Sequence, residues 1–582
     1  MIKLLCKYIA CFLFFSASAL WAQPGTVLKF QKISQTQGGF SVLLDDEDNF
    51  GQNIAALGDL NGDGIQDIAV GAGKDDDGGL NHGAVYILFL NPDGTVKGHQ
   101  KISDTAGGFT APLSSNDWLG GGMAGLGDLD GDDVPDLAVG AAGDNNGGNS
   151  AGAVYILFLN TDGTVKSYQK ISSSFGNFGG SLVADDQFGA KVANLGDLDG
   201  DDVVDLAVGA IRDSENGFSR GAIWILFLNA DGTVKSQQKI NESNGGFTGT
   251  LDNEDFFATV STLGDLDGDD VTDIAVGAER DDDGGTDRGA VWILFLNEDG
   301  TVKAHQKISS TDGGFTGVLD DGDLFGGTEG LGDIDNDGIP DLAVGARLDD
   351  DGGWARGAVW ILFLNSDGTV KSHQKISMTS GNFNHDLGYL GTFGGGIALL
   401  PDLDGDYRSE LVVGAHRDDD GGVGGNADRG AVYILNIDGV QDFTKLEESI
   451  SQKMVQMEVK RDEALGRLNE LLPLVSDVQN DLVFLMNQTS DPGRRDDLSE
   501  ALCRVHLIYE ITWKSRAWYT QSIQFLDEAQ SVVEGQAQVM CNPVLLLRTS
   551  ADLNTDGLVN YDDMALMTQV WMEQTLDPNS LQ

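Results

Sequence analysis

The sequence predicts an all-β six-bladed β-propeller, followed by an α-helical hairpin and a small helical module. Three observations predict the propeller: a unit of 68 or 69 residues occurs six times, each unit alternates short apolar runs with glycine-rich turns, and the two ends of the array complement each other. The 582-residue chain has 92 acidic and 36 basic residues, a formal charge of −56. This charge disfavours nucleic acid and anionic membranes as partners.

Each repeat is expected to form one four-stranded sheet. In the first repeat, residues 84–90 (AVYILFL) form the continuous apolar run of a strand buried on both faces. The turn at 91–94 (NPDG) joins this run to TVKGHQKIS as a hairpin. Residues 67–72 (DIAVGA) predict another short buried strand, and a fourth is expected near the preceding FG segment.

The ends of the array predict a closed ring. Residues 25–34 (GTVLKFQKIS) align without a gap with residues 94–103, but no hairpin partner precedes them. Residues 430–439 (GAVYILNIDG) supply a first hairpin strand that lacks a QKIS partner. We therefore expect the N-terminal strand to complete the last sheet, which gives six blades over residues 23–440. A seven-bladed ring and an open solenoid are the less favoured alternatives.

An acidic nonapeptide in each repeat predicts a metal site. In the second copy, DLDGDDVPD from Asp128 to Asp136, carboxylates occupy positions one, three, five and nine, and Gly131 permits a sharp bend. Two carboxylates about 4 Å apart repel by roughly 4 kcal/mol at an effective dielectric of 20 unless a cation lies between them. Oxygen ligands in a flexible loop favour Ca²⁺, and the absence of Cys and His disfavours softer metals. A solvated acidic turn, the alternative, does not explain a spacing that occurs six times.

The six loops predict about six Ca²⁺ ions in the propeller. Asn61 in the first loop and Glu410 in the sixth depart from aspartate, and both loops are still expected to bind. The predicted ligands occupy positions one, three, five, seven (through its carbonyl) and nine; they are Asp59, Asn61, Asp63, Ile65, Asp67, Asp128, Asp130, Asp132, Val134, Asp136, Asp197, Asp199, Asp201, Val203, Asp205, Asp265, Asp267, Asp269, Val271, Asp273, Asp333, Asp335, Asp337, Ile339, Asp341, Asp402, Asp404, Asp406, Arg408 and Glu410.

The order FG, DLDGDxxxD and VGA resembles the FG-GAP repeats of integrin α-chain propellers over residues 25–440. The chain departs from that family in its six rather than seven blades and in the residue after VGA, which is never proline. The resemblance implies an extracellular, non-catalytic adhesion or recognition module. The acidic segments at 74–79, 280–285 and 417–422 are candidates for binding a partner or further cations, and solvated loops are the alternative interpretation.

The N-terminus predicts export. Residues 1–22 combine two lysines, an apolar run and small residues before a cleavage position, which is typical of a secretory signal peptide. We therefore expect a secreted, extracellular or cell-surface protein with no integral membrane segment after signal removal. In such a compartment Cys503 and Cys541 are able to form a disulfide, but the sequence does not decide whether they meet.

Residues 441–545 have helical periodicity and predict an α-helical hairpin that serves as a stalk, a spacer or a dimerisation element. Residues 546–582 contain DLNTDGLVNYDD, which resembles one of the two loops of a dockerin, the module that docks onto cohesins. One further Ca²⁺ ion is expected there, and a cohesin-like partner is considered. The predicted ligands are Asp552, Asn554, Asp556, the carbonyl of Leu558, Asn560 and Asp563.

The sequence contains no recognisable catalytic motif, and the protein is therefore predicted not to be an enzyme. The leading hypothesis is a calcium-stabilised propeller that recognises an extracellular protein or polysaccharide. The second is an accessory, dockerin-bearing component of an extracellular polysaccharide-binding or -degrading assembly. A propeller enzyme is the third.

Overall fold

The chain divides in this computed structural model into two compact units, Met1–Gln441 and Asp442–Gln582. The structure describes residues 24–406, 408–419 and 428–441 of the first unit. Of the second it describes residues 477, 478, 480–485, 498, 499, 501, 502 and 505, all of them helical. The predicted signal peptide, the segment at 546–582 with its calcium loop, and both Cys503 and Cys541 lie outside the described residues.

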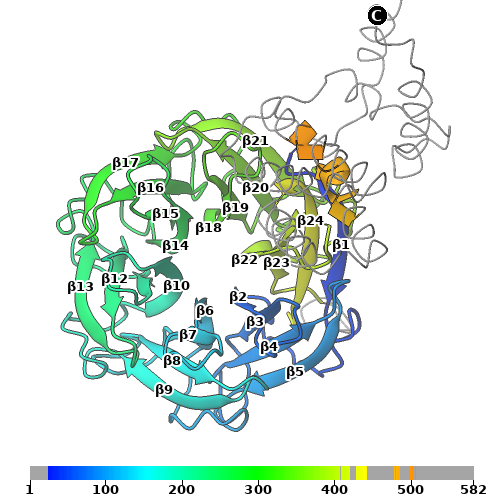
Figure 1. Cartoon of the computed structure of the whole chain (residues 1–582). Coiled ribbons are helices and arrows are strands. Elements are labelled where there is room, and N and C mark those ends of the chain that lie inside the picture. Colours follow the sequence, from blue (N-terminus) through cyan, green and yellow to red (C-terminus); the bar gives the residue numbers. More distant parts are fainter. Residues whose placement is uncertain are drawn as a thin grey trace, which may run out of the picture. The chain divides into compact units, whose positions relative to one another are not determined.

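Within the described part of residues 24–441, six four-stranded antiparallel sheets surround one axis (Figure 1). Blade one contains β2 (Ile54–Gly58), β3 (Asp67–Ala72), β4 (Ala84–Leu90) and β5 (Val96–Ile102). Blade two contains β6 (Leu119–Gly127), β7 (Asp136–Ala141), β8 (Ala153–Leu159) and β9 (Val165–Ile171). Blade three contains β10 (Phe188–Gly196), β11 (Asp205–Ala210), β12 (Ala222–Leu228) and β13 (Val234–Ile240).

The other three blades repeat the pattern. Blade four contains β14 (Phe257–Gly264), β15 (Asp273–Ala278), β16 (Ala290–Leu296) and β17 (Val302–Ile308). Blade five contains β18 (Phe325–Gly332), β19 (Asp341–Ala346), β20 (Ala358–Leu364) and β21 (Val370–Ser377). Blade six contains β22 (Phe393–Leu400), β23 (Arg408–Ala415), β24 (Ala431–Gln441) and, from the other end of the propeller, β1 (Val27–Ile33).

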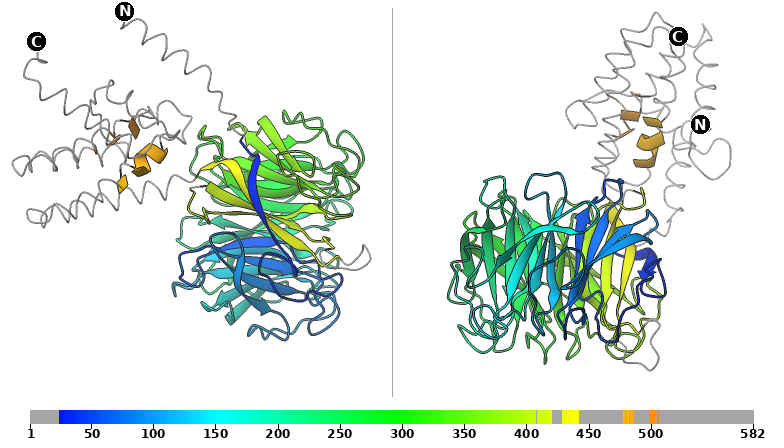
Figure 2. Two further views of the ribbon diagram at one scale, coloured as in Figure 1. Left: turned by 90° about the vertical axis from the view of Figure 1, so that its right-hand side faces the viewer. Right: turned by 90° about the horizontal axis from the view of Figure 1, so that it is seen from below.

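The ring closes through β1, as the sequence predicts. This strand pairs antiparallel with β24, with Phe30 opposite Leu435, and Figure 2 shows the two strands side by side. The first strand of each blade lies nearest the axis and begins at or just after the FG segment (Figure 1). The predicted four strands per repeat and the six-bladed ring are therefore confirmed.

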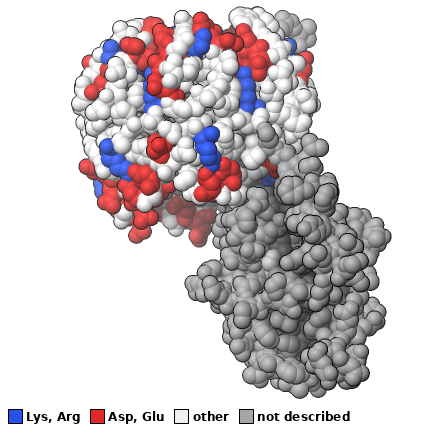
Figure 3. Space-filling model, turned by 90° about the horizontal axis from the view of Figure 1, so that it is seen from above, with Lys and Arg blue, Asp and Glu red and all other residues white. Residues whose placement is uncertain are grey.

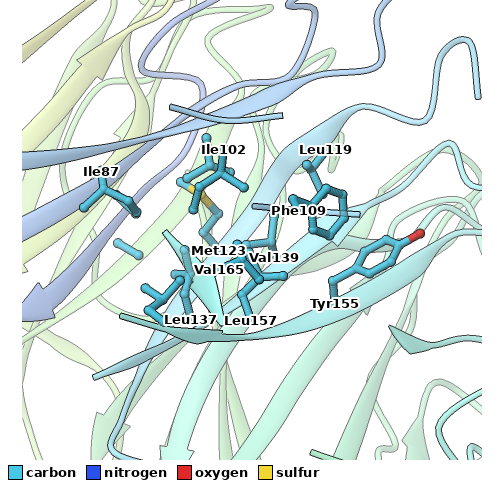
Figure 4. Close-up of a cluster of buried hydrophobic side chains, with 14 of the residues drawn as sticks. Ile87, Ile102, Phe109, Leu119, Met123, Leu137, Val139, Tyr155, Leu157 and Val165 are labelled. Atoms are coloured by element: carbon cyan, nitrogen blue, oxygen red, sulfur yellow. The ribbon is translucent and has the colours of Figure 1, made fainter. Parts of the chain in front are cut away.

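The hydrophobic core lies between neighbouring blades. Every residue of β3 and of β7 is buried, because each sheet is covered on both faces by its neighbours. Figure 4 shows one such cluster, which contains Ile87 of blade one together with Val139 and Leu157 of blade two. Burying a side chain of this kind contributes about 1.5–3 kcal/mol, so the six interfaces dominate the stability of the ring.

The glycines of VGA and FG allow the blades to approach closely. A Cβ atom on Gly140 would lie 1.8 Å from the carbonyl oxygen of Gly189, which belongs to the FG segment of the next blade. The same clash would arise at Gly277, 1.8 Å from the carbonyl oxygen of Gly326. The two motifs therefore meet across each interface, and a side chain at either glycine would separate the blades.

The second unit supplies only short helical stretches among the described residues. Val478, Leu482 and Leu485 are buried there, at the spacing of one helix face. The rest of the hairpin predicted at residues 441–545 lies outside the described residues, so the hairpin stays a prediction. No helix in the described ranges is long and apolar enough to cross a membrane.

Candidate metal centre

Each acidic loop connects the first strand of a blade to the second. In blade two, β6 ends at Gly127, the loop begins at Asp128, and Asp136 is the first residue of β7. The same arrangement recurs in every blade, so the loops lie at one end of the propeller. The segments that follow the VGA motifs begin at the opposite end of the propeller, where the second strands finish. They include the acidic segments that begin at residues 74, 280 and 417, which are called the acidic rim segments below.

The aspartate at position one shapes the loop. The carboxylate of Asp128 accepts hydrogen bonds from the backbone N–H groups of Gly131 at 2.8 Å, Asp132 at 2.9 Å and Asp133 at 2.7 Å. Asp133 has a φ of 66°, a left-handed conformation that aspartate tolerates better than most residues. Asp197 and Asp265 make the same three bonds in their loops. The loop is therefore wound around its first carboxylate.

The aspartate at position nine ties the loop to the blade. Asp136 is fully buried, and its two carboxylate oxygens accept the N–H groups of Leu129 in the loop and Leu159 at the end of β8, each at 3.1 Å. Burial raises the pKa of Asp136 to about 6, despite these two hydrogen bonds. A nearby cation would favour the ionised form, so this buried carboxylate fits a metal site.

The carboxylates of several loops converge as the sequence predicts. In four loops, three carboxylates each offer an oxygen within 4.8 Å of the others, and in the sixth loop four do. These described groups are Asp128, Asp130 and Asp136; Asp197, Asp199 and Asp205; Asp265, Asp267 and Asp269; Asp333, Asp335 and Asp341; and Asp402, Asp404, Asp406 and Glu410. Such sets of carboxylate oxygens are the ligands that a hard cation prefers.

Not every predicted ligand belongs to a convergent group. Asp132, Asp201 and Asp337 at position five stand outside the groups of their loops, and Asp273 at position nine stands outside the fourth. At position seven the structure shows the backbone N–H, not the carbonyl, in use: Val134 donates to Asp132 at 3.1 Å. The carbonyl ligands Ile65, Val134, Val203, Val271, Ile339 and Arg408 therefore stay predictions.

A lysine that the sequence analysis missed lies over each loop. In blade two, Lys166 of β9 contacts Asp130 at 2.6 Å and Asp132 at 2.5 Å. This hydrogen bond lowers the pKa of Asp132. The signal was visible as the lysine of the TVK segments, because Lys97, Lys235, Lys303 and Lys371 pair with their own loops in the same way. In blade six the aligned residue is Leu28, and the next residue, Lys29, pairs with Asp404 of the sixth loop instead. Figure 3 shows lysine and arginine side chains among the acidic patches of the propeller surface.

The first and sixth loops differ from the rest in their chemistry. In loop one the Asn61 amide donates to Asp67 at 3.2 Å. A hydrogen bond within the loop therefore replaces the carboxylate that the other loops have at position three. In loop six, Glu410 accepts the N–H of Leu403 at 2.9 Å and the amide of Asn436 at 3.2 Å. Burial raises the pKa of Glu410 to about 8. The longer glutamate thus preserves the buried carboxylate of position nine.

The acidic rim segments are partly structural. Asp75, the first aspartate of segment 74–79, is buried and pairs with Lys101 at 2.8 Å. The ammonium of Lys101 also lies over the ring of Tyr86, 5.4 Å from its centre. Asp281 and Asp418 are buried in the same way, with Lys307 and Lys32 as partners. These three aspartates therefore anchor each rim segment to its own blade. The alternative interpretation, that these segments are simply solvated loops, is wrong for these three residues.

A family model for the FG-GAP repeat matches residues 50–88, 121–157, 256–294 and 325–362. Each match spans the first three strands of one blade, from the FG region through the acidic loop and VGA. The resemblance predicted from the loops is confirmed for the propeller.

Three relatives illustrate the similarity. Integrin alpha-2 of Mus musculus is 41% identical over 96 residues, 16% of this chain and 8% of the relative. Integrin alpha-6 of Gallus gallus is 33% identical over 172 residues, 29% of this chain and 14% of the relative. A phosphatidylinositol-glycan-specific phospholipase D of Bos taurus is 29% identical over 189 residues, 31% of this chain and 21% of the relative. The chain therefore spans between 8% and 21% of these proteins, and its propeller is integrin-alpha-like.

Proposed function

We propose that the protein is a secreted, non-catalytic recognition module whose propeller is stabilised by calcium. One observation carries the proposal: the six repeats have nearly identical acidic loops at one end of the propeller, and different loops at the other. Constant loops suit a structural metal, and different loops suit recognition of a partner.

Calcium would act on the stability of the ring. The convergent carboxylates would repel one another less with an ion between them, and an ion bound only by the native state stabilises that state by mass action. We expect about six Ca²⁺ ions in the propeller of the purified chain, one further ion at the C-terminal loop, and a large loss of stability with chelator. Metal analysis and thermal unfolding of the full chain test this. An unchanged unfolding curve with no bound metal would contradict it.

The end opposite the acidic loops has exposed apolar tips suited to a partner. Leu80, Phe218 and Trp354 occupy one equivalent loop position in three blades and are 58%, 62% and 59% exposed. Trp354 packs on the ring of Tyr389 with centres 5.4 Å apart. Exposed large apolar side chains grouped on one surface are typical of interaction sites.

Binding to panels of extracellular proteins and polysaccharides tests this surface. The full chain with Leu80→Ser, Phe218→Ser and Trp354→Ser together should lose binding to the ligand that the unmodified chain selects. Leu28→Ser is the matched control, because Leu28 is exposed on the outer strand β1. Equal binding by the triple variant and the control would contradict the recognition surface. Hydrolysis of a phosphatidylinositol glycan by the purified chain would contradict the non-catalytic assignment.

The C-terminal loop supports a second candidate function, as an accessory component of a polysaccharide-binding or -degrading assembly. The spacing from Asp552 to Asp563 is that of a calcium loop with dockerin resemblance. If this candidate is right, the full chain binds a cohesin module in Ca²⁺ and Asp552→Ala abolishes that binding. Failure to bind a panel of cohesins would leave the recognition module as the single proposal.

A further inference from the structure

Lysine pairing singles out a cavity at the propeller axis. Fourteen lysines lie between residues 24 and 441. In the described part of that range, twelve of them form ion pairs with aspartates. The side chains of the remaining two, Lys74 and Lys191, have neither an ion pair nor a hydrogen bond among the described residues, and both residues line the same cavity. In so acidic a protein, two lysines without aspartate partners at one place require an explanation.

The cavity lies at the axis, at the end opposite the acidic loops. Its volume is about 360 Å³, and it is lined by residues that open the first strands or directly follow the second strands. Lys74 follows β3, whereas the acidic loop of the same blade precedes β3. Lys191 comes from the innermost strand of blade three and also lines a smaller cavity deeper along the axis. The site is therefore separate from the candidate calcium loops.

The lining differs between otherwise similar repeats. Six different residues follow VGA in the six repeats, and all but Gly73 of the first repeat line the cavity: Ala142, Ile211, Glu279, Arg347 and His416. A position needed only to build the ring would tolerate one residue in all six blades, as the preceding strand does. The cavity lining therefore differs from blade to blade, and such an asymmetric lining suits an asymmetric ligand.

The charges of the lining favour an anion. Glu279, an acid of this cavity, already accepts two N–H bonds from Arg347, at 2.7 and 3.2 Å. Glu329 lies in the deeper cavity, where burial raises its pKa to about 7 and the N–H of Leu399 donates to it at 3.1 Å. Burial and surrounding cations lower the pKa of His416 to about 3, so it is neutral. Burial lowers the pKa of Lys191, whereas the nearby carboxylates of Glu279 and Glu329 raise it. In its charged form the Lys191 ammonium has three donors, and an anion in the cavity would supply acceptors for them and favour that form.

The remaining lining is suited to a sugar ring. Trp118 lines the cavity, and aromatic rings commonly pack against apolar ligand faces. The side-chain amides of Gln52 and Gln187 also line it and make no hydrogen bond to other described side chains or backbone groups. Each amide offers one acceptor and two donors, which matches the hydroxyl groups of a saccharide.

We propose that the axial cavity binds a carboxylate-bearing sugar, with the carboxylate at Lys74 and Lys191 and the ring against Trp118. The proposal rests on the recognition function proposed above and specifies one ligand class for it. The ammonium groups form charge-assisted hydrogen bonds with the carboxylate, and the glutamine amides bind the hydroxyls. The cavity volume of about 360 Å³ lies in the range of small-molecule sites, roughly 300–1,000 Å³.

Calorimetric titration of the full chain in Ca²⁺ with galacturonate, glucuronate and tri-galacturonate tests the proposal. At least one acidic sugar should bind, and galactose and glucose should not. Lys191→Met and Lys74→Met should each weaken binding at least tenfold. Arg288→Met is the matched control and should bind unchanged, because Arg288 pairs with Asp321 and lines neither axial cavity. Circular dichroism melting of each variant verifies folding. Trp118→Ala should weaken the binding of the sugar acid more than the binding of inorganic phosphate.

Several results would overturn the proposal. These are no binding of any sugar acid, binding insensitive to both cavity lysines, and inorganic phosphate or an oligoglutamate peptide binding as tightly as the sugar acid. If the apolar-tip triple variant loses a macromolecular ligand while the cavity variants retain it, the axial proposal alone fails. If neither set of variants alters any binding, the recognition function fails as well.

Discussion

Replacing Asp136 with asparagine should have opposite effects on stability with and without calcium. Asp136 is buried at position nine of the second loop, accepts two backbone N–H groups, and belongs to a convergent carboxylate group. Asparagine keeps the shape and one acceptor oxygen but removes the charge. Without a cation the loss of a buried charge favours folding, whereas with a cation it removes a ligand.

The magnitude follows from the pKa. Burial raises the pKa of Asp136 from 3.8 to about 6 in the folded protein. Two pKa units correspond to about 3 kcal/mol, which is the penalty for keeping this carboxylate ionised at neutral pH without a metal. The asparagine NH₂ group faces one backbone donor, and leaving that donor unpaired costs about 1–3 kcal/mol. We therefore expect Asp136→Asn to change stability in chelator by a net gain of at most about 2 kcal/mol.

Urea unfolding of the full chain, followed by circular dichroism in chelator and in Ca²⁺, measures both effects. In Ca²⁺ the variant should bind one ion fewer and gain less stability from the metal than the unmodified chain. Asp133→Asn is the matched control, since this neighbouring aspartate is exposed and stands outside the convergent group. Equal destabilisation of Asp136→Asn in both conditions, with an unchanged metal count, would refute the assignment of position nine as a ligand.

Three further predictions concern the same loops. Lys166→Met removes the ammonium that pairs with Asp130 and Asp132, so calcium should bind this loop more tightly in titration calorimetry; weaker binding would contradict competition between lysine and metal. Asn61→Asp supplies the missing carboxylate of loop one, and should raise its calcium affinity; unchanged affinity would mean that Asn61 already serves equally well. Burial raises the pKa of Asp136 and of Asp341, so the folded chain binds more protons than the unfolded chain between about pH 4 and 7. Stability in chelator should therefore fall as pH rises through that window, and a rise there would refute the pKa directions.

The fold was predictable because the same strand and turn pattern occurs in each of the six repeats. The six acidic loops, the apolar runs and the complementary ends gave the strand count, the blade count and the closure by β1, which pairs with β24. The VGA and FG glycines were visible as motifs, but their shared purpose was not. Only the structure brings Gly140 against Gly189 of the next blade, because contacts between blades depend on how the sheets pack around the axis.

The candidate metal site was predictable in its carboxylates but not in its counter-ions. The alternate spacing in a turn predicted that Asp128, Asp130 and Asp136 lie close together, and the structure brings them together. The same spacing did not predict that Asp132 at position five stands outside this group. Lys166 is 36 residues from Asp130 and reaches it because the outermost strand of the blade runs back past the loop. A constant lysine on an outer strand looks like ordinary surface, and its pairing emerges only from the tertiary arrangement.

Backbone conformation gives an independent sign that the axial end is specialised. The residue before each FG segment has a left-handed φ between 52° and 60° in all six blades: Asn49, Trp118, Gln187, Phe256, Leu324 and Thr392. Glycine or asparagine would adopt this conformation at least cost, and a bulky residue there costs about 1–2 kcal/mol. The bend is needed in every blade, but the bulky side chains are not needed for the bend. Trp118 lines the axial cavity, and the ring of Phe256 lies under the guanidinium groups of Arg212 and Arg280. The strained backbone is therefore kept at positions where the bulky side chain makes a specific contact or lines the cavity.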